Sequence, residues 1–221
     1  MALPVCVFDA YGTLFNVHAA IGRHRDACGA DADRLSDLWR TKQLEYTWTL
    51  TLAGLYEDFW ILTERALDFA LARYPSVDAT LKPLLLESYF KLDAFADAGP
   101  ALQALKQRGH RTAILSNGSP DMLEAAVNAA GMKNLFDGLL SVAAIRIYKP
   151  RPEVYALVTK AFLVAPNEVL FVSSNRWDIM GAAGFGFDCV WINRAGLPDE
   201  YPQQTPARVI DSLSALPSVA D

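Results

Sequence analysis

Residues 4–15 have the sequence PVCVFDAYGTLF, and the fold of the whole chain can be inferred outward from them. The apolar run Pro4–Phe8 predicts a buried strand, because successive Val, Cys, Val and Phe side chains suit a strand covered on both faces. Asp9 follows directly, so a carboxylate stands at the carboxyl end of this strand. Ligands of open α/β sheets bind at that edge, which makes the residues after each later strand candidates for a functional site.

The segment from about residue 16 to residue 95 has a different pattern. Its apolar residues recur at helical spacing, as at Leu35, Leu38 and Trp39, and then at Phe59 and Leu62. This spacing predicts several helices in succession.

After residue 96 short apolar runs alternate with amphipathic segments. Strands are predicted at residues 112–115, 138–142, 169–172, 189–192 and 208–210, and helices at residues 100–107, 120–130, 152–163 and 178–184, with a short terminal helix. Strands that alternate with helices predict a parallel sheet with helices on both faces. The predicted class is therefore α/β, with a Rossmann-like core (residues 1–15 and 96–221) and an inserted all-helical cap (residues 16–95).

Composition excludes several classes of protein. The chain has 221 residues, of which 52% are hydrophobic, so it can form a core. Its 20 basic and 25 acidic residues give a net charge of −5, which argues against a nucleic-acid partner. We expect no membrane segment and no signal peptide, because no apolar run is long enough. Three scattered cysteines without a CxxC motif predict reduced, buried thiols in a cytoplasmic protein.

Polar side chains follow four of the predicted strands. Taken singly, each has an ordinary explanation, such as an Asx turn at Asp9, a helix N-cap at Ser119 or a first-turn charge at Asp178. Taken together at one edge of a sheet, they predict an active site. The segments are Asp9-Ala10-Tyr11-Gly12-Thr13, Ser116-Asn117-Gly118-Ser119, Tyr148-Lys149-Pro150 and Ser173-Ser174-Asn175-Arg176-Trp177-Asp178.

These segments resemble the four motifs of the haloacid dehalogenase superfamily, and most closely those of its L-2-haloacid dehalogenase branch. The motifs are DAYGTLF (9–15), LSNGSPDML (115–123), YKPRPEVY (148–155) and FVSSNRWD (171–178), and the segment WRTKQLEYTW (39–48) is also typical of that branch. The resemblance covers about residues 5–195. It implies that short L-2-haloalkanoic acids are hydrolysed to D-2-hydroxy acids and halide, and that the protein is a homodimer.

The resemblance also implies a set of catalytic roles. Asp9 is expected to attack carbon in an SN2 step, since a held and desolvated carboxylate is a competent nucleophile. Lys149 keeps that carboxylate ionised by its positive charge. Asp178 is expected to act as the general base on the water that hydrolyses the resulting ester, although helix-dipole compensation is an alternative. The expected supporting residues are Thr13, Ser173 and Asn175.

A second set of residues is expected to bind substrate or halide. Arg40, on a predicted cap helix, resembles the halide-binding arginine of the family, although a solvated helix charge is the ordinary alternative. The aromatic members of the set could equally be core residues. The expected set is Arg40 and Asn117 for halide, Ser116 for the substrate carboxylate, Tyr155 for a hydrogen bond near the substrate, and Tyr11, Phe59 and Trp177 for apolar walls.

No metal or cofactor is expected. Phosphatases of the superfamily have an acidic residue two positions after the nucleophile, where this chain has Tyr11. The fourth motif begins with Ser173 and contains a single acid, Asp178, so the carboxylates that magnesium prefers are few. The alternatives are a magnesium-dependent phosphatase and an altered homologue that only binds small carboxylates.

Arg176 departs from the pattern, because the family usually has a small residue at this place. A guanidinium there could face solvent, or it could enter the pocket and pair with Asp178.

Overall fold

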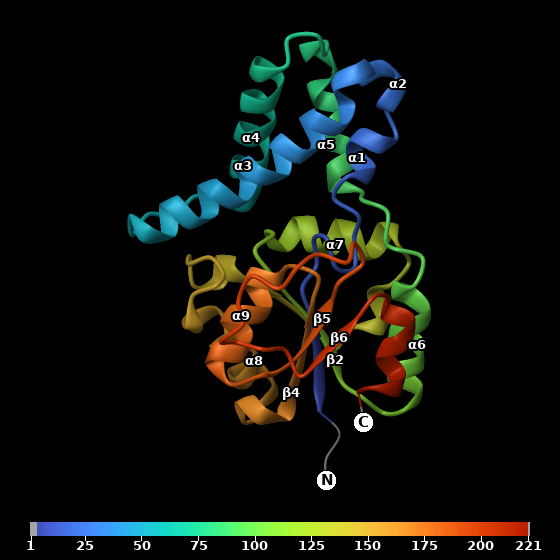
Figure 1. Ribbon diagram of the computed structural model, residues 1–221, viewed down its shortest axis with the longest axis vertical. Coiled ribbons are helices and arrows are strands. Elements are labelled where there is room, and N and C mark those ends of the chain that lie inside the picture. The colour runs from blue at the N-terminus through green and yellow to red at the C-terminus, as the bar shows by residue number, and fades with distance from the viewer. Residues whose placement is uncertain (1–3, 221) are drawn as a thin grey trace.

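The computed structural model describes residues 4–220, which form a parallel sheet with a helical region above it (Figure 1). The six strands run parallel in the order β3-β2-β1-β4-β5-β6. Their bounds are β1 (Val5–Phe8), β2 (Thr112–Ser116), β3 (Gly138–Ser141), β4 (Val169–Ser173), β5 (Asp188–Ile192) and β6 (Arg208–Ile210). The α/β prediction is confirmed, and each predicted strand matches the structure to within one residue at either end.

The register of the sheet brings the candidate segments together. Phe8 of β1 is level with Ile114 of β2 and with Val172 of β4. The residues that follow these three strands therefore emerge side by side at one edge. The strand order changes direction between β1 and β4, and such a switch point is where open α/β sheets bind ligands.

Helices of the core cover both faces of the sheet. The helix α6 (Ala98–Gln107) packs on β2 and α7 (Pro120–Ala129) packs on β3, whereas α9 (Arg176–Phe185) packs on β4, β5 and α8 (Pro152–Phe162). Right-handed crossovers in this strand order put the two pairs on opposite faces, and Figure 1 shows α6 and α9 on opposite sides of the strands.

Three details of the core helices differ from the prediction. The helices α6 and α9 each begin two residues earlier than expected, at Ala98 and Arg176, and the short terminal helix is the 3-10 helix η6 (Leu213–Ser218). Ser119 does stand at the N-cap position of α7, but its side chain makes no capping hydrogen bond. The remaining 3-10 turns are η1 (Gly29–Asp31), η2 (Ala79–Leu81), η3 (Lys133–Leu135), η4 (Val142–Ala144) and η5 (Pro166–Glu168).

The helical region, called the cap below, confirms the helices predicted after β1. It contains α1 (Ala19–Gly22), α2 (Arg25–Cys28), α3 (Ala32–Leu52), α4 (Phe59–Arg73) and α5 (Lys82–Phe90). The two long helices are joined by buried polar contacts: Trp39 Nε1 donates to the carbonyl oxygen of Thr63 at 2.9 Å, and Gln43 Nε2 donates to the Thr63 hydroxyl at 2.9 Å. Searched over residues 4–220, the structure contains no helix long and apolar enough to cross a membrane.

The cap enters and leaves the core at one place. The backbone N–H of Asn16 donates to Asp93 O at 2.9 Å, and that of Phe95 donates to Leu14 O at 2.8 Å. The two connecting segments therefore lie side by side. The assignment of residues 16–95 to a separate domain remains a prediction.

The glycines of α9 provide a matched test of core packing. A methyl group on Gly181 would lie 2.6 Å from Pro150 Cβ and closer still to the Tyr155 hydroxyl, whereas one on Gly184 meets no atom within 4 Å. We expect Gly181→Ala to lower the free energy of unfolding by about 1–3 kcal/mol through overpacking. We expect Gly184→Ala to raise it by about 0.5–1 kcal/mol, because alanine favours a helix. Urea unfolding measures both, and an unchanged Gly181→Ala protein would contradict this packing.

Candidate active site

Three buried charged side chains meet at the carboxyl edge of the sheet. Lys149 Nζ lies 3.1 Å from Asp9 Oδ1 and 2.7 Å from Asp178 Oδ2. The three residues are 1%, 5% and 0% exposed, respectively. Asp9 follows β1, Lys149 precedes α8 and Asp178 lies in the first turn of α9. We call these three residues the charged centre; with both carboxylates ionised it carries one net negative charge.

Two neutral donors fix the Asp9 carboxylate. The Thr13 hydroxyl donates to Asp9 Oδ2 at 3.0 Å, and Asn175 Nδ2 donates to the same oxygen at 2.8 Å. Gly12 has φ of 96°, a conformation that favours glycine, and it lets the chain turn so that Thr13 faces back toward Asp9. Oδ2 is thus held by Thr13 and Asn175, while Oδ1 faces Lys149.

The serines after β4 support these donors. Ser173 Oγ accepts from the Asn175 backbone N–H at 3.0 Å, so Ser173 helps to position the asparagine. Ser174, which the sequence did not single out, donates its backbone N–H to Thr13 Oγ1 at 2.8 Å and its hydroxyl to Gly12 O at 2.7 Å. The signal in the sequence that could have identified Ser174 was its place in the motif FVSSNRWD, between Ser173 and Asn175.

Asp178 and Lys149 titrate away from their ordinary ranges. Burial raises the pKa of the Asp178 carboxyl to about 6, with the nearby charge of Asp9 adding to the effect and Lys149 opposing it. Burial alone would lower the pKa of Lys149, but Asp178 and Asp9 outweigh it and raise that pKa above its usual value. The ammonium is therefore retained at neutral pH, and Asp178 is a carboxyl that can exchange a proton near pH 6.

Tyr155 is placed to hold Asp178. Its hydroxyl donates to Asp178 Oδ1 at 2.8 Å, and its buried ring packs edge-on against Phe171 and Phe187, with ring centroids 5.9 Å apart in both pairs. The predicted hydrogen bond of Tyr155 is therefore directed at the aspartate, and its ring also packs in the core. We treat it as a residue that positions Asp178.

The cap approaches the charged centre through Arg40 and aromatic residues. Arg40 Nη2 donates to the backbone oxygen of Tyr11 at 3.2 Å. The Tyr11 ring stacks on Tyr89 at 5.9 Å and lies 6.2 Å from Phe59. Burial, together with Tyr89 and Asp9, raises the pKa of the Tyr11 phenol well above its usual value, so this side chain is a neutral wall rather than an acid.

Ser116 is the last residue of β2, and Asn117 follows it directly. Asn117 Oδ1 accepts from the Lys149 backbone N–H at 3.1 Å, and Ser116 Oγ accepts from the Gly118 N–H at 3.0 Å. A Cβ atom on Gly118 would lie only 2.6 Å from the Tyr11 ring, so glycine is required for this close approach. Asn117 thus contacts Lys149 of the charged centre, whereas Ser116 contacts Gly118, which packs against Tyr11.

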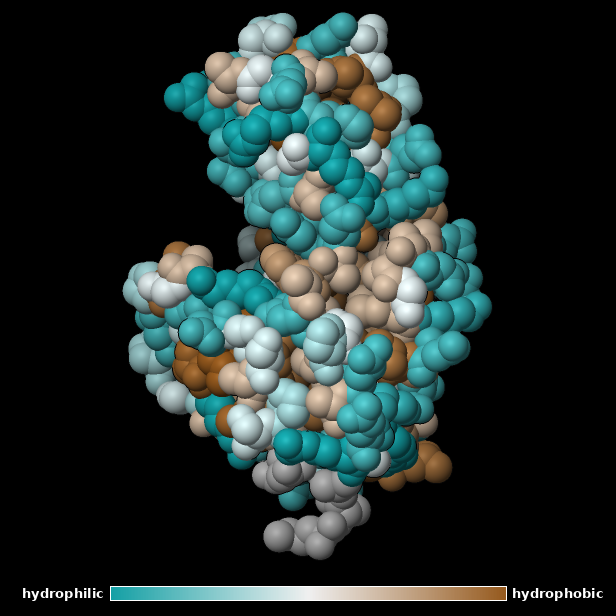
Figure 2. Space-filling view, turned by 90° about the vertical axis from the view of Figure 1, so that its right-hand side faces the viewer, coloured by the Kyte–Doolittle hydropathy of each residue, from teal (hydrophilic) through white to brown (hydrophobic). Residues whose placement is uncertain are grey.

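Two cavities flank the charged centre where the cap meets the core, and Figure 2 shows the surface hollowed between the two parts. One cavity of about 340 Å³ is bordered by Lys149, Trp48 and Trp177, whose two indole rings meet edge to face at 5.5 Å. The other, of about 380 Å³, is bordered by Arg40 and Asn175. Of the predicted site residues, Lys149 and Trp177 line the first cavity, and Arg40 and Asn175 line the second.

Arg176 does neither of the things considered from the sequence. It is 4% exposed, so it does not face solvent, and its Nε donates to Asp199 Oδ1 at 2.7 Å instead of pairing with Asp178. The buried cysteines Cys28 and Cys189 agree with the thiols expected from the sequence.

The carboxylates are arranged around an ammonium. Over residues 4–220 no group of three or more His, Cys, Asp or Glu side chains could hold a metal ion. Lys149 Nζ lies between the two nearest carboxylates, Asp9 and Asp178, and its charge offsets one of their two negative charges. A metal-independent reaction remains a prediction.

Comparison with known proteins identifies relatives along nearly the whole chain. The family of haloacid dehalogenase-like hydrolases matches residues 3–186. An (S)-2-haloacid dehalogenase 4A of Burkholderia cepacia is 49% identical over 216 residues, which are 97% of this chain and 94% of that protein. An (S)-2-haloacid dehalogenase 1 of a Pseudomonas species is 49% identical over 218 residues, or 98% and 96% of the two chains.

Solved structures agree with this result. The L-2-haloacid dehalogenase of Xanthobacter autotrophicus with chloropropionic acid covalently bound has a TM-score of 0.88 at 36% identity, covering 99% of this chain and 98% of that one. A dehalogenase with an intermediate complex has a TM-score of 0.96 at 47% identity, covering 98% and 96%.

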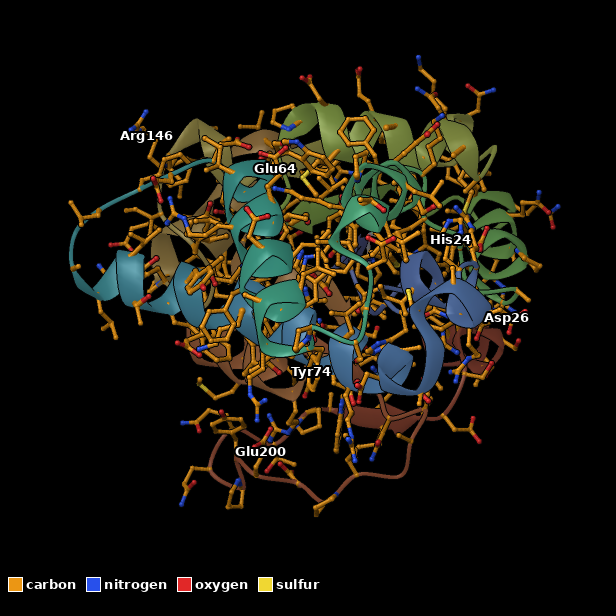
Figure 3. The ribbon with its side chains drawn as sticks, turned by 90° about the horizontal axis from the view of Figure 1, so that it is seen from above. His24, Asp26, Glu64, Tyr74, Arg146 and Glu200 are labelled. Atoms are coloured by element: carbon orange, nitrogen blue, oxygen red, sulfur yellow. The ribbon has the colours of Figure 1, made fainter. Side chains whose placement is uncertain are left out.

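The Tyr155 hydroxyl should lower the pKa of Asp178, because it donates to the charged form of the carboxyl. We expect Tyr155→Phe to raise that pKa from about 6 by about one unit, the size expected for one hydrogen bond to a charged group. The ¹³C NMR titration of the aspartate carboxyl carbons measures it. Tyr74→Phe in the cap, where Figure 3 labels the residue at the end of α4, is the control. An unshifted titration in Tyr155→Phe would contradict the assigned contact.

Proposed function

The chain belongs to the haloacid dehalogenase-like hydrolases, and we propose that it hydrolyses the carbon–halogen bond of short L-2-haloacids through an ester on Asp9. One observation carries the proposal. A single buried carboxylate is held by Thr13, Asn175 and Lys149, in a chain 49% identical to (S)-2-haloacid dehalogenases over nearly its whole length.

The first step is an attack by Asp9 Oδ1 on the carbon that bears the halogen. Oδ2 is engaged by Thr13 and Asn175, which leaves Oδ1, beside Lys149, as the attacking atom. The new O–C bond forms as the C–halogen bond breaks, and the halide leaves with its electron pair. Attack from the side opposite the halogen inverts the carbon once, so an L-2-haloacid yields a D-2-hydroxy acid.

Burial makes this carboxylate reactive. Asp9 is 5% exposed, so water does not stabilise its charge as it would at the surface. The ammonium of Lys149 lies beside Oδ1, and the two neutral donors fix the orientation of the carboxylate before the substrate arrives.

Arg40 and Asn117 are the groups for the departing halide, and the Ser116 loop is the place for the substrate carboxylate. Arg40 approaches the charged centre from the cap, where it already donates to Tyr11 O at 3.2 Å. Its cation offsets the charge that develops on the halogen. Tyr11, Phe59 and Trp177 supply apolar walls that exclude water from this step.

The second step hydrolyses the ester. In the ester Oδ2 is the carbonyl oxygen, and the Thr13 hydroxyl and the Asn175 amide already donate to it. These donors stabilise the negative charge that develops on Oδ2 when water adds to Asp9 Cγ. Asp178 takes the proton from that water, and its placement against Lys149 and Tyr155 supports this role as a base. When the adduct collapses, the bond between Cγ and the bridging oxygen Oδ1 breaks. The departing hydroxy-acid oxygen takes the proton back from Asp178, and Asp9 is left as a carboxylate with one oxygen from water.

We also propose an oligomeric state and a cellular location for the protein. The chain forms a homodimer, which is supported by exposed apolar side chains on the cap at Leu52, Leu55, Ile61 and Phe69. It works in the cytoplasm, which is supported by thiols that remain buried without a disulfide at Cys28 and Cys189.

Halide release tests the proposed reaction directly. We expect chloride from L-2-chloropropionate and not from the D enantiomer, at a rate that excess EDTA does not change. Asp9→Asn should abolish release, because the amide cannot form the ester. Halide from neither enantiomer, together with magnesium-dependent release of phosphate from a phosphate ester, would overturn the proposal in favour of a phosphatase.

Asp178→Asn separates the two steps. We expect this variant to release about one halide per active site and then to stop, because the amide cannot accept the proton from the hydrolytic water. The trapped ester adds the carboxyalkyl group of the substrate (1-carboxyethyl from L-2-chloropropionate) to the mass of the intact protein, which mass spectrometry detects on the peptide containing Asp9. Asp9→Asn, which should release no halide, is the control. Repeated turnover by Asp178→Asn at the wild-type rate would remove Asp178 from the role of base.

A further inference from the structure

Arg176 is a buried arginine between two site residues, and its guanidinium is directed away from the charged centre. Its Nε donates to Asp199 Oδ1 at 2.7 Å, and its Nη2 donates to the carbonyl oxygens of Tyr201 at 2.6 Å and Gln204 at 2.9 Å. Adjacent helix residues point in different directions, so Arg176 can face this loop while Trp177 faces the cavity. Because Asp199 pairs with the guanidinium, the positive charge of Arg176 is not available to an anionic substrate.

The same guanidinium lies over two aromatic rings. Its central carbon is 5.7 Å from the Trp191 ring centroid and 5.5 Å from that of Tyr201. Trp191 in turn donates from Nε1 to Ser174 O at 3.2 Å. One side chain therefore connects the Tyr201 loop to the end of β5 and to the segment that supports Thr13.

The loop at residues 199–204 depends on this connection. It lies between β5 and β6 in a stretch without helix or strand, and Figure 3 labels Glu200 on it at an edge of the molecule. Within the described part of the chain, its other hydrogen bonds join residues of the same stretch, such as Tyr201 N to Asp199 Oδ1 at 2.9 Å. Arg176 therefore supplies the hydrogen bonds that hold this loop on the core.

Tyr201 is one wall of the cavity of about 340 Å³ beside the charged centre. The other lining residues include Trp48, Trp177 and Met180, so the lining is largely apolar. Lys149, which contacts both Asp9 and Asp178, also borders the cavity. An alkyl chain extending from a substrate at Asp9 would meet this apolar space.

We propose that Arg176 is a positioning residue for substrate specificity: through Asp199 and Tyr201 it holds the loop at 199–204 as a wall that binds the alkyl group of longer 2-haloacids. The inference rests on the proposed function. It predicts that the loop affects long acids selectively, because the short methyl group of L-2-chloropropionate would not extend to Tyr201.

Arg176→Met tests this, because methionine keeps an apolar stem and loses the planar donors. We expect KM for L-2-bromohexanoate to rise about tenfold, the loss for roughly two methylene groups without apolar contact. The kcat for both acids and KM for L-2-chloropropionate should stay within about twofold of wild type, since Asp9, Lys149 and Asp178 are untouched. Arg34→Met, which removes an exposed arginine paired with Asp31, is the matched control and should change neither KM.

Further variants show whether Arg176 acts through Tyr201. Tyr201→Ala and Asp199→Asn should reproduce the selective rise in KM, and they carry the test if Arg176→Met does not fold. The double variant Arg176→Met/Tyr201→Ala should have the KM of Tyr201→Ala alone, because residues acting through one contact are not additive. A rise in KM by the same factor for both acids, or additive effects in the double variant, would overturn the inference alone. Failure of the wild type to release halide from either acid would overturn the proposed function as well.

Discussion

Lys149 makes one contact with each of two buried carboxylates, and most of the site is arranged around that pair of contacts. Without the ammonium, Asp9 and Asp178 would repel each other in a place where water cannot solvate them. Without the carboxylates, a lysine that is 1% exposed would lose its charge. The end of β1, the segment before α8 and the start of α9 therefore have to keep fixed positions relative to one another. Close packing around them, such as that of Gly181 against Tyr155, helps to keep these positions fixed.

The two carboxylates acquire different chemistry from different surroundings. Asp9 receives hydrogen bonds from Thr13 and Asn175 in addition to its contact with Lys149. Asp178 is fully buried, and burial raises its pKa to about 6 despite the neighbouring ammonium. A pair of acids whose environments separate them in this way can divide nucleophilic and basic roles within one pocket. Because both residues are aspartates, the difference between them comes from their positions in the fold.

Much of this arrangement could be predicted from the sequence. The strands were predictable because they are short apolar runs with clear ends, and Asp9 and Asp178 because they follow such runs. The hydrogen-bond partner of Tyr155 could not be predicted, since a helical tyrosine has the same spacing whether it packs in the core or binds a carboxylate. The direction of the Arg176 side chain could not be predicted either, because its partner Asp199 lies in a stretch without periodicity. Ser174 was missed because a serine after a strand is an ordinary turn residue.

The adjacent entry and exit of the cap bear on how such proteins diversify. Leu14 and Phe95 are joined by a backbone hydrogen bond, so the residues between them form a single insertion whose two ends meet beside the sheet. Insertions whose ends already meet can change in length and content at little entropic cost to the rest of the fold. Asp9, Lys149 and Asp178 all come from the core, whereas Arg40 comes from the inserted segment. A change in the inserted segment can therefore alter what approaches the charged centre while leaving Asp9, Lys149 and Asp178 in place.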